Sequence, residues 1–374
     1  MEGYNKKVIM SYWTICRMKT TKKIYVKVSI IFLLGGILLF SSCEKEENQK
    51  IEANRKTLFM YLPWSSNLTN YFYNNISDLE KCITKIGLNN EKVIVFISTG
   101  STEAMMFEIV SSHGRCKREI LKKYKSPPFT TIDGITAILN DVKAFAPASV
   151  YTMIIGCHGM GWLPVYEMKV RSAPHMKMHW EYQGVPLTRY FGGLTAEYQT
   201  DIKSLASGIA NAGMKMEYIL FDDCYMSSIE VAYELKDVTK YLIGSTSEMM
   251  AYGMPYAAIG EYLLGNPDYQ SGCEEFYNFY STYEIMPCGT LAVTDCSELE
   301  NMAAIIKSIN SKYSFDKSLR GTIQRLDGHT KNFYTMAKGI IPINTFSGIT
   351  TSDPSDNPMT VLKENTLWYK AAHN

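Results

Sequence analysis

Two apolar segments of this chain each end at a residue that could take part in acyl transfer. Residues 151–156 form the first segment, and His158 follows it after one residue. Residues 216–221 form the second, and the sequence Asp-Asp-Cys, which ends at Cys224, follows directly. Both segments have the composition of buried strands, and catalytic groups in parallel sheets gather at the carboxyl ends of strands. The sequence therefore predicts a thiol hydrolase with His158 as base and Cys224 as nucleophile.

The predicted nucleophile needs activation, because the ordinary pKa of a thiol is about 8.5. A helix is predicted at about 226–237, and its positive end would favour the thiolate of Cys224. His158 would supply the imidazole and later protonate the leaving amine. The backbone N–H groups of Gly159 and Cys224 are suited to hold an oxyanion, since glycine permits close approach. Each residue alone is more often structural, as a buried inert thiol or a loop histidine, but the pair at successive strand ends favours catalysis.

The elements that must position these residues alternate from about residue 56. Buried strands are predicted at 58–62, 93–98, 151–156, 217–221, 241–246 and 290–294, and amphipathic helices at 131–146, 196–211, 226–237 and 298–313. This alternation predicts an α/β fold with a mainly parallel sheet covered on both faces. Residues 162–193 carry Pro164, Pro174 and Pro186 without periodicity, which predicts a long loop between the two catalytic strands.

Composition excludes several other classes of protein. The 374 residues are 46% hydrophobic and 20% charged with a net charge of +1, which is ordinary for a globular chain and gives no electrostatic case for nucleic acid. Nine cysteines without a C-x-x-C pair do not favour a disulfide framework or a zinc ribbon. His175 and His179 have the spacing of a zinc-binding helix, but no Glu follows His175 and Pro174 precedes it, so no metal site is predicted.

The N-terminus has the pattern of a secretory signal, predicted at residues 1–42 with Met18 as an alternative start. Four lysines precede an apolar run at 28–40 that, at about 13 residues, is shorter than the roughly 20 needed to span a bilayer. Cys43 then resembles the lipidated cysteine of a bacterial lipobox, although Phe40 stands where Leu, Val or Ile is usual. Residues 43–55 are predicted to form a lipidated tether, in which Lys-Glu-Glu is either a surface-export signal or a plain charged linker. The expected location is the outer membrane, on its periplasmic or surface face.

Three sequence blocks resemble the clostripain-like cysteine peptidases, which are relatives of caspases, gingipains and legumain. The blocks are MIIGCHGMGW at 153–162, LFDDCYMSSIEVAYEL at 220–235, and GSTSE at 244–248 with GMPY at 253–256. The similarity extends over nearly everything after residue 56. It implies a caspase-like α/β/α sandwich over 56–374 and a catalytic dyad, here His158 and Cys224, without an obligatory third member.

The resemblance also implies cleavage after a basic residue, read by an acidic side chain in the S1 pocket. The matching position is Asp222, where a carboxylate would pair with Arg or Lys and reject apolar side chains, although a nearby anion also opposes thiolate formation. Glu248 is a further candidate for this pocket. Asp223 is predicted to cap the following helix instead. Asn67 and Asn75 begin glycosylation sequons, a modification that a bacterial lipoprotein is not expected to carry.

Many relatives are activated by self-cleavage in the loop between the catalytic strands. The basic residues of 162–193 are Lys169, Arg171, Lys177 and Arg189, of which Lys169 or Arg171 is the expected site. No cofactor is predicted to be required. Calcium dependence stays open because some relatives need the ion, and residues 353–364 match a calcium loop only in part.

These inferences lead to a lipid-anchored cysteine endopeptidase that cuts proteins or peptides after Arg or Lys, and a monomer is expected. The alternative from another class is a catalytically weak surface lipoprotein that uses the same fold to bind peptides or glycans. A third alternative is a peptidase with a different primary specificity.

Overall fold

The computed structural model forms one compact unit from residue 51 onward. The residues it describes are 54–65, 67–159, 161–165, 192–193, 196–285, 287, 289–312, 349–350 and 363–373. The predicted signal peptide and Cys43 lie outside these residues, as does the tether except for its last positions. Within the described part, no helix combines the length and hydropathy that crossing a bilayer needs.

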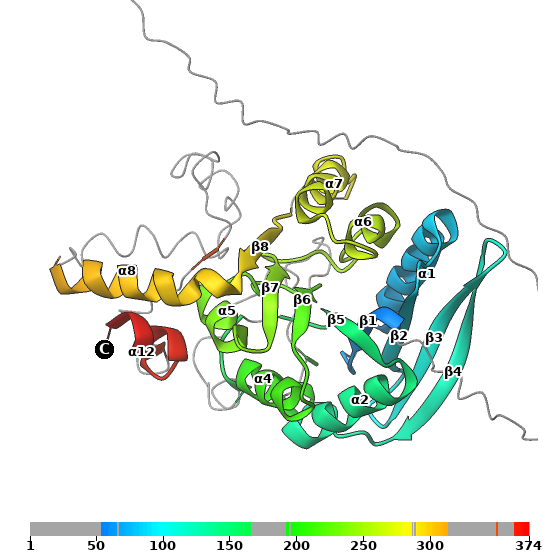
Figure 1. Cartoon of the computed structure of the whole chain (residues 1–374), viewed down its shortest axis with the longest axis horizontal. Helices are drawn as coiled ribbons and strands as arrows, with labels where there is room; N and C mark the ends of the chain where they lie inside the picture. The colour runs from blue at the N-terminus through cyan, green and yellow to red at the C-terminus, as the bar shows by residue number, and fades with distance from the viewer. Residues whose placement is uncertain are drawn as a thin grey trace, which may run out of the picture. The chain divides into compact units, whose positions relative to one another are not determined.

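A single sheet organises the unit, and its eight described strands lie in the order β4-β3-β2-β1-β5-β6-β7-β8 (Figure 1). The strands are β1 (Asn54–Leu62), β2 (Glu91–Ser98), β3 (Glu103–Ser112), β4 (Arg115–Lys125), β5 (Ala148–Ile155), β6 (Met216–Phe221), β7 (Thr239–Gly244) and β8 (Ala292–Asp295). Five adjacent strands, β2, β1, β5, β6 and β7, run parallel, whereas β3, β4 and β8 pair antiparallel at the two edges of the sheet. The predicted mainly parallel sheet is confirmed.

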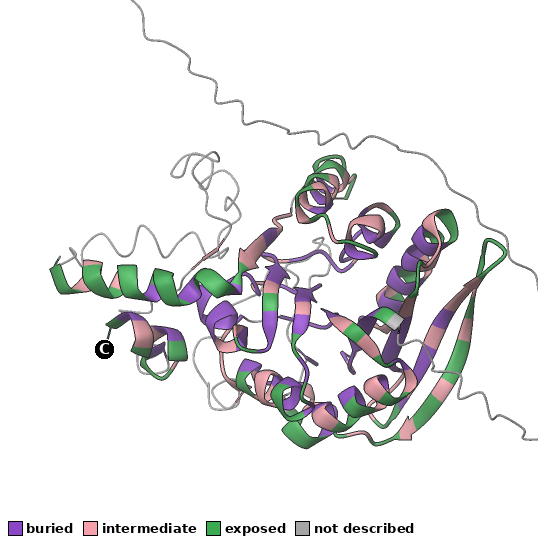
Figure 2. Cartoon of the chain, in the orientation of Figure 1, coloured by how far each residue is buried: buried purple, intermediate pink, exposed green. Residues whose placement is uncertain are grey.

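Helices cover both faces of this sheet. They are α1 (Thr69–Ile86), α2 (Ile132–Phe145), α4 (Ile202–Asn211), α5 (Ile229–Leu235), α6 (Tyr256–Leu263), α7 (Tyr269–Ser281), α8 (Leu299–Lys312) and α12 (Leu367–His373). The side chains of β1 alternate between the two faces: Phe59 and Tyr61 join the core under α2, α4 and α5, whereas Leu58 and Met60 join the core under α1, α6 and α7. Figure 2 shows the buried residues along the inner strands and the inward sides of the helices. The result is a three-layer α/β/α sandwich.

Several predicted boundaries differ from the structure. The helix predicted at 226–237 is α5, which begins only at Ile229 because the side chain of Ser228 accepts a hydrogen bond from the N–H of Val231 and caps it. The helix predicted at 196–211 is a short 3₁₀ turn, Ala196–Tyr198, followed by α4. The hairpin of β3 and β4 was not predicted, since the edge strand β4 is mostly exposed and rich in lysine and arginine.

The order of the strands reverses next to β1. The chain passes from β1 to β2 on one side, and β5, β6 and β7 follow on the other side. Ligand sites in such sheets lie at the carboxyl ends of the strands beside this reversal. The carboxyl ends of β1, β5 and β6 are therefore the place where a site is expected.

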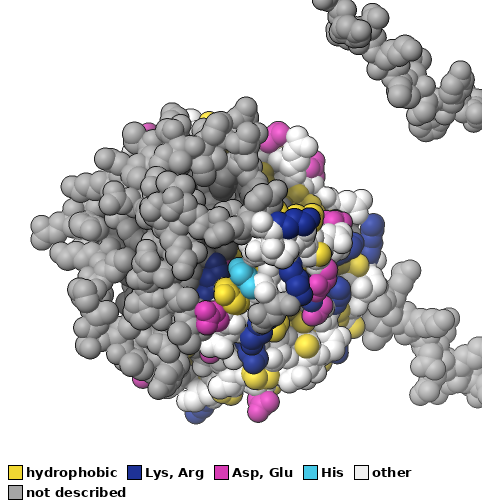
Figure 3. All heavy atoms as spheres, turned by 90° about the vertical axis from the view of Figure 1, so that its left-hand side faces the viewer, with side chains coloured by type: hydrophobic (Ala, Val, Ile, Leu, Met, Phe, Trp, Pro, Cys, Tyr) yellow, Lys and Arg dark blue, Asp and Glu magenta, His cyan; other side chains and the backbone are white. Residues whose placement is uncertain are grey.

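Charges of both signs are distributed over the surface. On the face that Figure 3 shows, lysine and arginine side chains of the described residues are interspersed with aspartate and glutamate. This agrees with the near-neutral balance of 38 basic and 37 acidic residues in the whole chain.

Candidate active site

His158 lies just beyond the carboxyl end of β5 and is fully buried. Its backbone N–H donates to the carbonyl oxygen of Gly192 at 3.1 Å, which fixes the backbone on one side. Its ring atom Nε2 lies 2.8 Å from Oδ1 of Asn67, an exposed residue of the loop after β1. Sequence reasoning missed this partner, because Asn67 stands 91 positions away and its local pattern suggested only a sequon.

Cys224 lies just beyond the carboxyl end of β6, the strand next to β5, and is also fully buried. Its Sγ accepts a hydrogen bond from the backbone N–H of Met249 at 3.1 Å. Tyr225, the next residue, has φ of +60°, a left-handed conformation that is uncommon for a bulky side chain. Strained backbone of this kind is concentrated at functional sites, where the surrounding contacts hold it. Here Tyr225 is held by a bond from its N–H to the carbonyl oxygen of Ser247.

The two strand ends meet at Gly159. A Cβ atom placed on Gly159 would lie 2.3 Å from the carbonyl oxygen of Cys224 and 2.7 Å from its nitrogen, so only glycine fits there. The residue after His158 therefore packs directly on the backbone of Cys224. This arrangement brings together the three residues predicted for the base, the nucleophile and the oxyanion donors.

Asp223 joins the same two strand ends from inside the protein. Its Oδ1 accepts the backbone N–H of Cys157 at 2.6 Å, and its Oδ2 lies 3.4 Å from the Sγ of Cys157. Both residues are buried. The prediction that Asp223 caps the following helix is wrong, since Ser228 caps α5. Asp223, the residue before Cys224, is instead bonded to Cys157, the residue before His158.

Asp222 is buried beneath the segment that follows β7. Its Oδ1 accepts the N–H of Met254 at 2.8 Å, and its Oδ2 accepts the hydroxyl of Tyr256 at 2.9 Å. Glu248 of the same segment accepts the hydroxyl of Tyr225 at 2.9 Å. Residues 248–256 therefore contact the loop of the nucleophile at both Cys224 and Asp222.

A segment far along the chain completes the support of the nucleophile loop. Ile229 donates its N–H to the carbonyl oxygen of Thr350 at 2.8 Å, and Thr350 donates to that of Ser227 at 3.1 Å. Nearby, the Nζ of Lys363 lies 3.3 Å from Oε1 of Glu230, and both side chains are largely buried. The loop after Cys224 is thus held by backbone pairing and by an ion pair from the C-terminal part of the chain.

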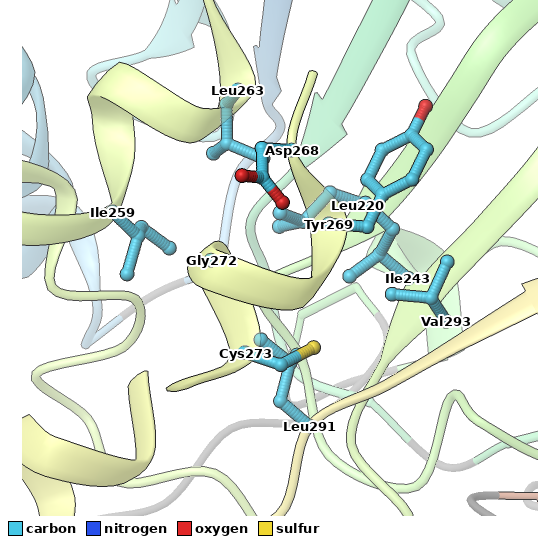
Figure 4. A pocket seen from close by; sticks show the side chains of 10 residues that line it. All are labelled: Leu220, Ile243, Ile259, Leu263, Asp268, Tyr269, Gly272, Cys273, Leu291 and Val293. Carbon is cyan, nitrogen blue, oxygen red and sulfur yellow. The ribbon is translucent and has the colours of Figure 1, made fainter. Parts of the chain in front are cut away.

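Other predicted sites fall elsewhere. Lys169, Arg171, Lys177 and Arg189 lie outside the described residues, as does most of the partial calcium motif. Among the residues that the structure describes, no three His, Cys, Asp or Glu side chains gather as metal ligands would. Figure 4 shows a mainly apolar recess lined by residues of β6, β7, α6, α7 and β8, with Asp268 and Cys273 among its lining. Its lining includes neither His158 nor Cys224, so it is separate from the candidate site.

Comparison with known proteins agrees with this geometry. The model of the clostripain family matches residues 60–365. A secreted C11 cysteine protease from Bacteroides thetaiotaomicron, "iotapain", is 52% identical, with 86% of this chain and 99% of that chain covered and a TM-score of 0.74. No match was found among curated proteins.

Two more distant structures share the fold. One is a secreted C11 cysteine protease of B. thetaiotaomicron in complex with an irreversible peptide inhibitor, at 19% identity, 85% and 98% coverage and a TM-score of 0.65. The other is an inactive zymogen of a C11 protease from Parabacteroides distasonis, at 21% identity, 85% and 98% coverage and a TM-score of 0.63. The chain belongs to the clostripain family and is a cysteine peptidase with a caspase-like fold. The predicted family and class of enzyme are confirmed.

Proposed function

We propose that this peptidase is an endopeptidase that cuts after Lys or Arg and uses His158 and Cys224 as its catalytic residues. The observation that carries the proposal is the contact of Gly159 with the backbone of Cys224, which places the residues after β5 and β6 against each other. Among the described residues that directly follow the five parallel strands, His158 is the only histidine, and β5, which leads to it, lies next to β6, which leads to Cys224.

The reaction follows from this placement. The S–H bond of Cys224 breaks, its proton passes to His158, and the thiolate attacks the carbonyl carbon of the scissile bond. The backbone N–H groups of Gly159 and Cys224 hold the oxygen that becomes negative. The C–N bond then breaks as His158 returns the proton to the leaving amine. Water attacks the remaining thioester while His158 takes its proton, and the S–C bond breaks to release the acid and regenerate the thiol.

Asp222 is the proposed reader of the basic side chain before the scissile bond. Its carboxylate lies two positions before Cys224, and its two hydrogen bonds, from Met254 and Tyr256, fix its orientation. A Lys or Arg side chain would add a charge-assisted bond to this carboxylate. Because Asp222 is only 1% exposed, segment 248–256 has to shift before a substrate side chain reaches it.

A panel of fluorogenic peptides that differ only at the residue before the bond tests this function. We expect cleavage after Lys and Arg, no cleavage by Cys224→Ala, and loss of the basic preference in Asp222→Ala. Cleavage after other residues with Asp222 intact would assign a different specificity. No cleavage of any peptide under reducing conditions would instead support a role in binding peptides or glycans.

Self-processing and export belong to the same proposal. Cleavage is expected at Lys169 or Arg171, so the purified protein should consist of two fragments and Cys224→Ala of one intact chain.

Removal of residues 1–42 and diacylation of Cys43 should appear in the mass of the N-terminal peptide and vanish in Cys43→Ser. Activity measured with and without a calcium chelator will decide whether the ion matters, and gel filtration will test the expected monomer.

A further inference from the structure

The hydrogen bond between Asn67 and His158 connects the catalytic pair to a third strand. Oδ1 of Asn67 lies 2.8 Å from Nε2 of His158. Asn67 follows β1, and β1 pairs directly with β5, the strand that leads to His158. The contact therefore lies at the reversal of the strand order, beside the residues that follow β5 and β6.

We propose that Asn67 is a positioning residue that holds the imidazole of His158 so that Nδ1 exchanges the proton with Cys224. An amide oxygen only accepts hydrogen bonds, so Nε2 carries the hydrogen of this contact. In the neutral ring, Nδ1 is then the basic nitrogen. The inference rests on the proposed function, because a base is required only if Cys224 attacks the substrate.

The proposed contact persists through the whole reaction. When Nδ1 receives the proton of Cys224, both ring nitrogens carry hydrogen and the ring becomes cationic. The bond from Nε2–H to Asn67 then becomes charge-assisted and stronger. Asn67 thus favours the imidazolium and fixes the plane of the ring without gaining or losing a proton itself.

The loop around Asn67 is built to hold its side chain in place. Ser65 is fully buried, and its hydroxyl donates to the carbonyl oxygen of Pro63 at 2.8 Å. Leu68 is fully buried on the other side, and α1 begins with the next residue. Asn67 itself is exposed, so its replacement removes the contact with His158 without opening a cavity in the core.

The described titratable groups on the strand ends next to His158 each have a contact of their own. Cys224 and Asp223 follow β6, and Asp223 is bonded to Cys157, which follows β5. Tyr61 comes from β1, donates to the carbonyl oxygen of Phe129, and has a pKa raised well above its ordinary value by burial. Asp222 is held by the segment after β7. Replacing the neutral Asn67 by Asp therefore adds one negative charge next to Nε2 of His158, while these other groups stay unchanged.

The test uses Asn67→Leu, which removes the acceptor, and Asn67→Asp, which keeps it. Cleavage of a Lys peptide should show kcat lowered about 10- to 100-fold by Asn67→Leu with little change in KM, because the ring is no longer oriented. Asn67→Asp should retain most of the activity, and the acid limb of its pH profile should move up by about one pH unit, because the carboxylate stabilises the imidazolium and only the neutral ring can accept the proton of Cys224. A residue that only supported the loop would not produce this shift.

A second readout does not depend on substrate turnover. The rate at which iodoacetamide labels Cys224, measured by peptide mass spectrometry against pH with Cys157 as internal reference, reports the thiolate directly. Rapid labelling in the wild type with a profile altered in both variants supports the proposal. Rapid labelling with unchanged profiles overturns the role of Asn67 and leaves the peptidase function standing. Labelling of Cys224 no faster than Cys157 overturns both. If Asn67→Leu does not fold, the shift in Asn67→Asp decides alone.

Discussion

The two ends of the central sheet bury ionisable side chains for different purposes. At the amino end, the ammonium group of Lys56 donates to the carbonyl oxygens of Leu263 at 2.6 Å and Gly265 at 3.3 Å. These carbonyls lie at the end of α6, where helices leave acceptors unsatisfied, so the lysine completes the fold. At the carboxyl end, His158 and Cys224 are equally buried, but they lie on loops next to strained backbone.

The comparison teaches that burial alone does not mark a reactive group. Lys56 has a pKa lowered to about 8 by burial, with only partial compensation from Glu91 at 4.0 Å, and yet it lies at the opposite end of the strands from Cys224. The carboxyl end differs, because residues that follow three neighbouring strands, β1, β5 and β6, lie close together there. There, the proposed base and the proposed nucleophile come from separate loops.

The largest expected contrast concerns two buried cysteines at the carboxyl end. Cys224→Ala should lower kcat/KM by about 10⁴-fold or more, because the nucleophile is lost. Cys157→Ala removes the cysteine next to His158 and keeps the backbone N–H that Asp223 accepts, so activity should stay within about 10-fold. Steady-state kinetics with a Lys peptide provide the measurement. Equal losses in the two variants would contradict the assignment of Cys224.

At the amino end, Lys56→Met should change how stability depends on pH. Burial lowers the pKa of Lys56 from 10.5 to about 8, so between these values the unfolded chain binds more protons than the folded one. The contribution of Lys56 to the free energy of unfolding therefore rises with pH across this window, by about 3 kcal/mol. Urea unfolding should show that the free energy of unfolding of the wild type increases relative to that of Lys56→Met as the pH increases.

The control for this experiment is Lys123→Met, which removes an exposed lysine of β4. If the difference in the free energy of unfolding between the wild type and Lys56→Met does not vary with pH, the lowered pKa of Lys56 is contradicted. Peptidase activity of Lys56→Met at neutral pH should match that of the wild type.

Asp223→Ala should affect both stability and catalysis. It leaves the buried N–H of Cys157 without its acceptor, which costs about 2 kcal/mol in the free energy of unfolding. It also loosens the link between the residues before His158 and Cys224, so kcat should fall as well. Asp237→Ala, at an exposed carboxylate that pairs with Lys236, should cost less than about 1 kcal/mol. Similar losses in both variants would indicate that the contact of Asp223 with Cys157 contributes no more to stability than an exposed ion pair.

The smallest contrast is between two helix caps. Ser228 caps α5 and Thr131 caps α2, each by accepting a backbone N–H three residues on. Alanine at either position should lower stability by about 1 kcal/mol. Only Ser228→Ala should also lower kcat, because Ser228 lies in the loop that holds Cys224. Thermal unfolding measures the loss of stability, and steady-state kinetics measure kcat in both variants. An equal effect on kcat in the two variants would show that the cap at Ser228 has no special role in catalysis.

The sequence predicts the layers of this fold well and the start of α5 poorly. The apolar runs at β5 and β6 are long enough to be identified, and the residues that follow them lie where parallel strands place chemistry. The start of α5 was missed because residues 224–227 satisfy their backbone with Ser245, Ser247 and Thr350, partners distant in the sequence. A local sequence pattern cannot reveal hydrogen bonds to residues that are distant in the chain.

The contact between Asn67 and His158 could not be predicted for the same reason. The predicted strand at 58–62 does not end directly at Asn67, because Pro63 and a stretch without periodicity lie between them. Only the order of the strands, with β1 next to β5, brings the amide to the imidazole. The charged strand β4 was missed since its exposed lysines suggest a solvated segment.

The pairing of Thr350 with Ser227 has a consequence for biosynthesis. The two residues are 123 positions apart, so a ribosome makes Cys224 long before it makes Thr350, which supports the loop after Cys224. A nascent chain that ends before Thr350 contains Cys224 and His158 but lacks this support. The candidate site therefore lacks this support until most of the polypeptide has emerged from the ribosome.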